Sequence, residues 1–208
     1  MSLFFIIFLA ILAAFLLLTL SAALKAIWQR PGRSRSVPKN DLAPGSHWVS
    51  EALLTVGIAL AWWNVSTGWV LYRAVYPIYV DMSAVSPEAF HAFGIGYLSR
   101  LAIVILPYGL MCLVWSLLLW VKHPNVSRAK VWSIVVILLI SVVVTPLAGT
   151  AQDTMSETGF AADLYDRLKW AHLVRTIMVT AAGILALVVM SDVRTESNNT
   201  TSYAEARL

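Results

Sequence analysis

The strongest constraint on the fold is a series of long apolar runs that carry no charge. The first extends from Leu3 to Leu24 and contains no Asp, Glu, Lys or Arg. About 20 apolar residues in a helix cross the hydrocarbon core of a bilayer, where a helix satisfies its own backbone hydrogen bonds. The chain is also 59% hydrophobic and only 12% charged, whereas soluble domains contain about 25% charged residues. An all-α polytopic membrane protein is therefore predicted.

Five transmembrane helices are expected from these runs. They cover Leu3–Leu24, Glu51 to beyond Val70, Leu101–Val121, Val131–Leu147 and Trp170–Val189. The predicted organisation is an N-terminal transmembrane helix (1–24), a basic cytoplasmic loop (25–50), an antiparallel four-helix transmembrane bundle (51–190) and a disordered cytoplasmic tail (191–208). Small residues permit close helix packing, so Gly57, Ala61, Ala182 and Ala186 are expected at helix contacts.

The distribution of Lys and Arg predicts the orientation. The first loop carries the basic residues Lys25, Arg30, Arg33, Arg35 and Lys39, and the third carries Lys122, Arg128 and Lys130. Such an excess marks cytoplasmic loops. The N-terminus is then outside and the C-terminus inside, most simply in the cell membrane. The basic loop lacks the aromatic interleaving of a nucleic-acid surface, so membrane lipids are the expected partners and nucleic acid is not.

No cofactor or metal is expected from the motifs. Cys112 is the only cysteine, which excludes an intramolecular disulfide and any cluster built on several cysteines. Of the four histidines, His47 and His123 are predicted on the cytoplasmic side and His91 and His172 on the other. Only the second pair could share a haem, but no haem motif accompanies it. A dinucleotide fingerprint, a phosphate loop and a zinc-protease motif are also missing from the sequence.

His172 and Arg175 are the leading candidates for a functional site. They lie three residues apart on the last predicted helix and so share a face. A charged group inside a membrane helix usually faces the protein interior or water. Further candidates at the same predicted outer level are His91, Arg73, Arg100 and Asp153. Asp153 is the expected counter-ion of Arg175 or Arg100. The alternatives are an Arg175 that extends to the headgroups and ion pairs with a purely structural role.

Several short motifs lie in the region from about Glu51 onward. The second span ends in Gly68 and Tyr76-Pro77, the third begins with Phe90-His91 and Arg100, and the fourth ends in Thr145-Pro146. The last helix opens with Trp170-Ala171-His172-Leu173-Val174-Arg175-Thr176. In these features the chain resembles the anthrone-oxygenase-like family of small four-helix membrane proteins, with Leu3–Leu24 as an added span.

The resemblance implies a function for these residues. Some members of that family oxidise anthrones to anthraquinones without metal or flavin. The resemblance points to His91, His172 and Arg175 as catalytic positions. Arg100, Arg73 and Asp153 are the expected substrate-binding positions because they lie at the same predicted outer level. A histidine base and an arginine that holds an oxyanion would suit such chemistry. They would equally suit a non-catalytic membrane protein that binds a lipid, a quinone or a protein partner, and this alternative stays open.

Overall fold

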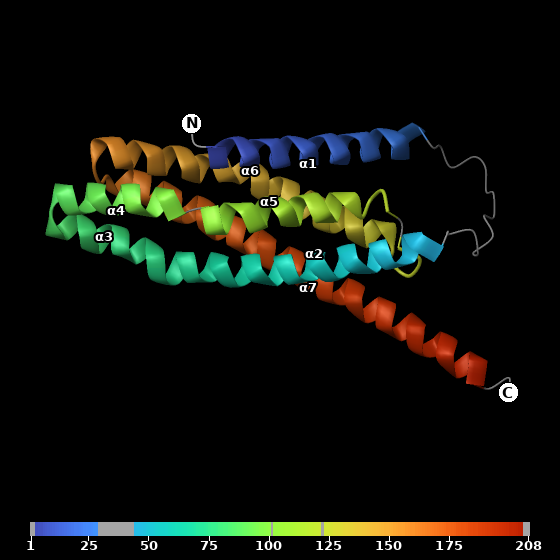
Figure 1. Cartoon of the computed structure of the whole chain (residues 1–208). Coiled ribbons are helices and arrows are strands. Elements are labelled where there is room, and N and C mark those ends of the chain that lie inside the picture. The colour runs from blue at the N-terminus through green and yellow to red at the C-terminus, as the bar shows by residue number, and fades with distance from the viewer. Residues whose placement is uncertain (1–2, 29–43, 101, 122, 206–208) are drawn as a thin grey trace. The chain divides into compact units, whose positions relative to one another are not determined.

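A computed structural model of the chain describes residues 3–28, 44–100, 102–121 and 123–205 (Figure 1). All the regular structure in these residues is helical. The elements are α1 (Leu3–Trp28), α2 (Pro44–Val70), the π-helix η1 (Leu71–Val75), α3 (Tyr76–Val85), α4 (Pro87–Arg100), α5 (Ala102–Leu117), α6 (Arg128–Thr158) and α7 (Ala162–Glu205). The predicted all-α fold is confirmed.

Four stretches of helix are long and apolar enough to cross a membrane. They are Ala10–Trp28, Trp48–Val85, Arg128–Thr158 and Ala162–Thr195. The remaining predicted span differs, because α5 has only 16 residues and would extend about 24 Å at 1.5 Å per residue. A separate helix, α4, precedes it. The protein is thus an all-α polytopic membrane protein.

Helix boundaries differ from the expectations in three places. The second run continues as helix past Pro77 to Val85. Residues 25–28 and 44–50 of the predicted basic loop are helical, whereas Arg30, Arg33, Arg35 and Lys39 lie outside the described residues. Helix α7 continues to Glu205, through most of the segment for which disorder was predicted.

The chain forms two compact units. Unit 1 contains residues 1–59, 109–135 and 184–208, and unit 2 contains residues 60–108 and 136–183. Unit 1 is held partly by polar contacts between helices. The Thr19 and Ser116 hydroxyls lie 3.0 Å apart and join α1 to α5. Lys130 of α6 forms an ion pair with Asp192 of α7.

Small residues lie where the packing is closest. Gly57, Ala61, Ala182 and Ala186 are all buried, as predicted. A Cβ atom on Gly57 would lie 3.3 Å from both the Trp115 ring and a Val114 methyl. Glycine and alanine permit close helix approach in membranes, where dispersion contacts rather than the hydrophobic effect hold helices together.

Unit 2 contains an aromatic core formed by α3, α4, the last turns of α6 and the start of α7. Its buried members are Tyr76, Tyr79, Phe90, Ala151, Met155, Tyr165 and Leu168. At the start of helix α4 the Ala89 amide donates to the Ser86 hydroxyl at 3.1 Å, which caps the helix. The Glu88 backbone amide and the Ser86 hydroxyl also bind the Glu88 carboxylate and lower its pKa.

Candidate functional site

His172 lies at the centre of the candidate site, in unit 2. Its side chain is 1% exposed, and its Nε2 atom lies 3.1 Å from the Gly68 carbonyl oxygen of α2. A carbonyl can only accept, so Nε2 must carry the proton that forms this bond. In the neutral imidazole the other nitrogen, Nδ1, then presents a lone pair. The contact with Gly68 thus selects one tautomer.

Two donors converge on this Nδ1 atom. The Tyr76 hydroxyl lies 3.0 Å from it, and Nη2 of Arg175 lies 3.3 Å from it. The Tyr76 and His172 rings meet edge to face, with centroids 4.7 Å apart. His172 and Arg175 therefore share a helix face, as their spacing predicts, and the Arg175 guanidinium contacts the imidazole of His172.

The π-helix η1 positions Tyr76. Its closing hydrogen bond runs from the Tyr76 amide to the Leu71 carbonyl, one residue further back than in an α-helix. The wider turn precedes Pro77, which has no amide hydrogen and crowds the preceding turn. Tyr72, Tyr76 and Tyr79 would share a face in a regular helix. In the structure Tyr76 and Tyr79 are buried, and Tyr72 is half-buried and packs against the same aromatic core.

Gly68 permits α2 and α7 to approach closely at the site. A Cβ atom at this position would lie 3.0 Å from the Thr176 hydroxyl oxygen and 3.2 Å from its methyl carbon. Real Cβ atoms rarely come so near another atom. Glycine at this position therefore lets the Gly68 carbonyl reach the imidazole of His172, which lies one helical turn before Thr176.

Arg175 faces protein rather than extending away from it. Its guanidinium carbon lies 5.4 Å from the centre of the Tyr108 ring, a distance at which cation–π attraction operates. The Tyr108 hydroxyl in turn donates to Ser141 at 2.8 Å, which fixes the ring. These contacts contradict the alternative in which Arg175 extends freely to the headgroups.

Further hydroxyl groups surround the cluster. The Tyr79 ring packs edge to face on Phe93, with centroids 5.0 Å apart, and on Tyr97, with centroids 5.9 Å apart. The hydroxyls of Tyr79 and Thr176 are buried without a hydrogen-bond partner among the described residues. Buried hydroxyls usually have a partner, so these two hydroxyls of unit 2 are exceptions.

His91 does not join this cluster by any hydrogen bond among the described residues. It is exposed, and its Nδ1 atom donates to the Ser156 carbonyl at 2.9 Å, which connects α4 to α6. His172 already uses both ring nitrogens, so haem ligation by this pair would break the contacts of both residues. The structure thus gives His91 a helix-joining contact.

The other three predicted positions are exposed. They are Arg73 in η1, Arg100 at the end of α4, and Asp153 in α6. Among the described residues, no ion pair links Asp153 to Arg175 or Arg100, which contradicts the predicted counter-ion. The cause is helical register, because Ala151 and Met155 face the core and Asp153 lies about 200° around the helix from Ala151.

Sequence reasoning missed the tyrosines of the site. Tyr76 was named only as part of the Tyr76-Pro77 motif, and Tyr97 and Tyr108 were not singled out. The Tyr76-Pro77 pair was the available signal, because a proline in a long apolar helix often accompanies a local change of helical register. The uncharged residues Gly68 and Thr176 gave no comparable signal.

No protein-family model matches the chain, and neither a curated protein nor a solved structure is similar to it. The function therefore has to be argued from the geometry of His172, Arg175 and Tyr76.

Proposed function

We propose that this integral membrane protein binds a hydrophobic aromatic molecule through a phenol or enol group at His172 and Arg175. The supporting observation is that the hydroxyl oxygen of a phenol, the Tyr76 side chain, already lies 3.0 Å from Nδ1 of His172. Arg175 lies beside the same nitrogen. A ligand hydroxyl in place of that of Tyr76 would meet a proton acceptor and a cation together.

The chemistry proposed at this point is deprotonation. His172 would accept the hydroxyl proton at Nδ1, and the guanidinium of Arg175 would stabilise the oxygen anion in a low-dielectric environment. The new imidazolium and Arg175 would both be cations, so the anion between them offsets their repulsion. Because His172 is 1% exposed, the Tyr76 hydroxyl must leave Nδ1 before a ligand can bind there.

The reaction that we propose to follow is oxygenation without a cofactor, as the anthrone-oxygenase-like resemblance implies. Molecular oxygen would accept electrons from the anthrone anion. One oxygen atom would become the new carbonyl of the anthraquinone, the other would leave as water, and the methylene carbon would lose both hydrogens. The alternative is a protein that binds the ligand and does not turn it over.

Oxygen uptake by the purified protein with anthrone and simpler phenols tests this proposal. We expect the wild type to take up oxygen and His172→Gln to abolish this uptake. The control Arg167→Ala changes an exposed arginine earlier on α7 and should leave the uptake unchanged. Binding without uptake would exclude the oxygenase and leave the binding protein. If no compound of the panel bound to the protein or caused oxygen uptake, both the oxygenase and the binding protein would be contradicted.

We further propose that the protein lies in the cell membrane with its N-terminus outside and its C-terminus in the cytoplasm. The supporting observation is the Lys and Arg content of the first and third loops. In this arrangement α4 and α5 together form the third crossing, and the His172 cluster lies toward the outer face.

A further inference from the structure

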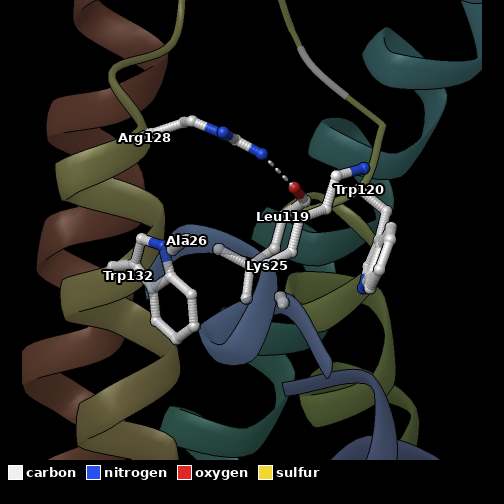
Figure 2. Close-up of a pocket in the computed structure, with 7 residues that line it drawn as sticks. Lys25, Ala26, Leu119, Trp120, Arg128 and Trp132 are labelled. Atoms are coloured by element: carbon white, nitrogen blue, oxygen red, sulfur yellow. Dashed lines mark hydrogen bonds between the residues drawn. The ribbon is translucent and has the colours of Figure 1, made fainter. Parts of the chain in front are cut away.

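A second polar site lies in unit 1, where α1, α6 and the turn after α5 come together. It is a cavity of about 100 Å³. The lining residues come from α1, from the turn after α5 and from α6: Ala22, Lys25, Ala26, Leu119, Trp120, Arg128 and Trp132. Figure 2 shows Arg128 extending from α6 toward Leu119, with Trp132 on the same helix. The proposed function makes no use of this site.

The charge of the lining is positive. Lys25 and Arg128 both contribute to it, and none of the described residues that line the cavity carries a carboxylate. Arg128 donates one hydrogen bond from Nη2 to the Leu119 carbonyl at 3.0 Å. A guanidinium has five N–H donors, so this anchor holds the side chain in place and leaves donors for an anion.

Tryptophan side chains form the apolar part of the lining. The Lys25 ammonium nitrogen lies 4.9 Å from the centre of the Trp120 ring, and the Trp120 indole N–H donates to the Leu18 carbonyl at 3.2 Å. The ring is therefore held at both its face and its edge. The contact with Trp120 thus joins Lys25 of α1 to the turn after α5.

The cavity lies at the ends of candidate membrane spans. Lys25 is three residues from the end of the span Ala10–Trp28, and Arg128 is the first residue of the span Arg128–Thr158. Tryptophan is enriched at the level of the lipid headgroups, and basic pockets between membrane helices bind anionic headgroups. Both cations belong to the side that the basic residues predict to be cytoplasmic.

We propose that this cavity binds a phosphate group, that of an anionic membrane lipid. Arg128 would bind two phosphate oxygens with its planar donors, and Lys25 would add a second positive charge. Trp120 and Trp132 would contact the glycerol and the first part of the acyl chains. The α1 helix is then joined to α6 and the turn after α5 by a lipid as well as by its own side chains.

Native mass spectrometry of the full-length protein in a phosphate-free detergent tests this site. The probes are phosphatidylglycerol, phosphatidylcholine and inorganic phosphate at constant ionic strength. We expect preferential binding of phosphatidylglycerol, weakened about fivefold to tenfold by Lys25→Gln or Arg128→Gln. The matched control is Arg194→Gln, at an exposed arginine in unit 1 outside the cavity. Arg128→Lys, which keeps the charge, should retain the fold and weaken binding less.

The outcomes separate the sources of the phosphate. Phosphatidylglycerol binding that depends on Lys25 and Arg128 supports a lipid site. Inorganic phosphate binding with the same dependence, without a preference for phosphatidylglycerol, supports a phosphate site with a soluble source. Equal phosphatidylglycerol binding by the wild type and both glutamine variants, or an equal loss in the Arg194→Gln control, would overturn the proposal.

Discussion

At the scale of single residues, the chemistry of the site follows from which nitrogen of His172 holds the proton. The Gly68 carbonyl requires the proton on Nε2, and this leaves Nδ1 as the acceptor for Tyr76 and Arg175. An arginine beside an acceptor nitrogen favours a negatively charged partner at the same point. In the structure that position is occupied by the neutral hydroxyl of Tyr76.

The variant Tyr76→Phe tests whether this hydroxyl competes with a ligand. Loss of the hydrogen bond should lower the free energy of unfolding by about 1 kcal/mol. A phenol should nevertheless bind more tightly, by about fivefold, because it no longer has to displace Tyr76. Dissociation constants measured by equilibrium dialysis check the effect, with Tyr72→Phe as the control at a half-buried tyrosine. Weaker binding to Tyr76→Phe alone would mean that Tyr76 holds the ligand rather than competing with it.

At the scale of helices, the site depends on how α2 and α7 approach each other. Gly68 and Thr176 form the closest point, and the Trp69 indole N–H donates to the Thr180 hydroxyl at 3.2 Å one turn further along α7. The π-helix η1 then changes the register of the chain before Tyr76. A small separation of the two helices would therefore break the bond from Nε2 to Gly68.

The variant Gly68→Ala measures this close approach. A Cβ atom 3.0 Å from the Thr176 oxygen should lower the free energy of unfolding by about 1–3 kcal/mol. Gly149→Ala on α6 is the matched control, since a Cβ atom there has no neighbour within 4 Å. It should be neutral or stabilising by up to about 1 kcal/mol. Unfolding in detergent followed by circular dichroism gives both values, and an equal effect of the two substitutions would contradict the packing account.

The helices and one part of the site could be predicted from sequence, for physical reasons. Long apolar runs have few structures available in lipid, and two polar residues three apart on an apolar helix must share a face. The expected ion pair of Asp153 was wrong because the predicted fourth span ended near Leu147, whereas α6 continues to Thr158 and places Asp153 on an exposed face. Tyr76 was missed because its position depends on a π turn, which has no strict residue pattern.

At the scale of the whole molecule, the units contain polar sites of different character. Unit 2 holds the neutral His172 with a single cation beside it, whereas unit 1 holds a cavity lined by two cations and two tryptophans. The first arrangement suits a weakly acidic hydroxyl and the second suits a permanent anion. These requirements match a hydrophobic phenol and a lipid phosphate, respectively.

The proposed orientation is a property of the whole chain and can be tested by reporter fusions. A reporter at Arg35 and another at Leu208 should both give a cytoplasmic signal, because the first loop carries a concentrated excess of basic residues. A reporter inserted after Gly159, between α6 and α7, should give an extracytoplasmic signal. An extracytoplasmic signal from Arg35 or Leu208 would overturn the orientation and with it the outward position of the His172 cluster.

The central claim is that His172 deprotonates the bound ligand beside Arg175. The absorption spectrum of anthrone bound to the protein under anaerobic conditions tests this claim most directly. Deprotonation at His172 should shift the absorption of the bound molecule to the longer wavelengths of its anion. Arg175→Ala should reduce the bound anion by at least about tenfold, whereas Arg167→Ala should leave it unchanged. An unshifted spectrum with saturating protein, or the same shift with Arg175→Ala as with the wild type, would contradict the account.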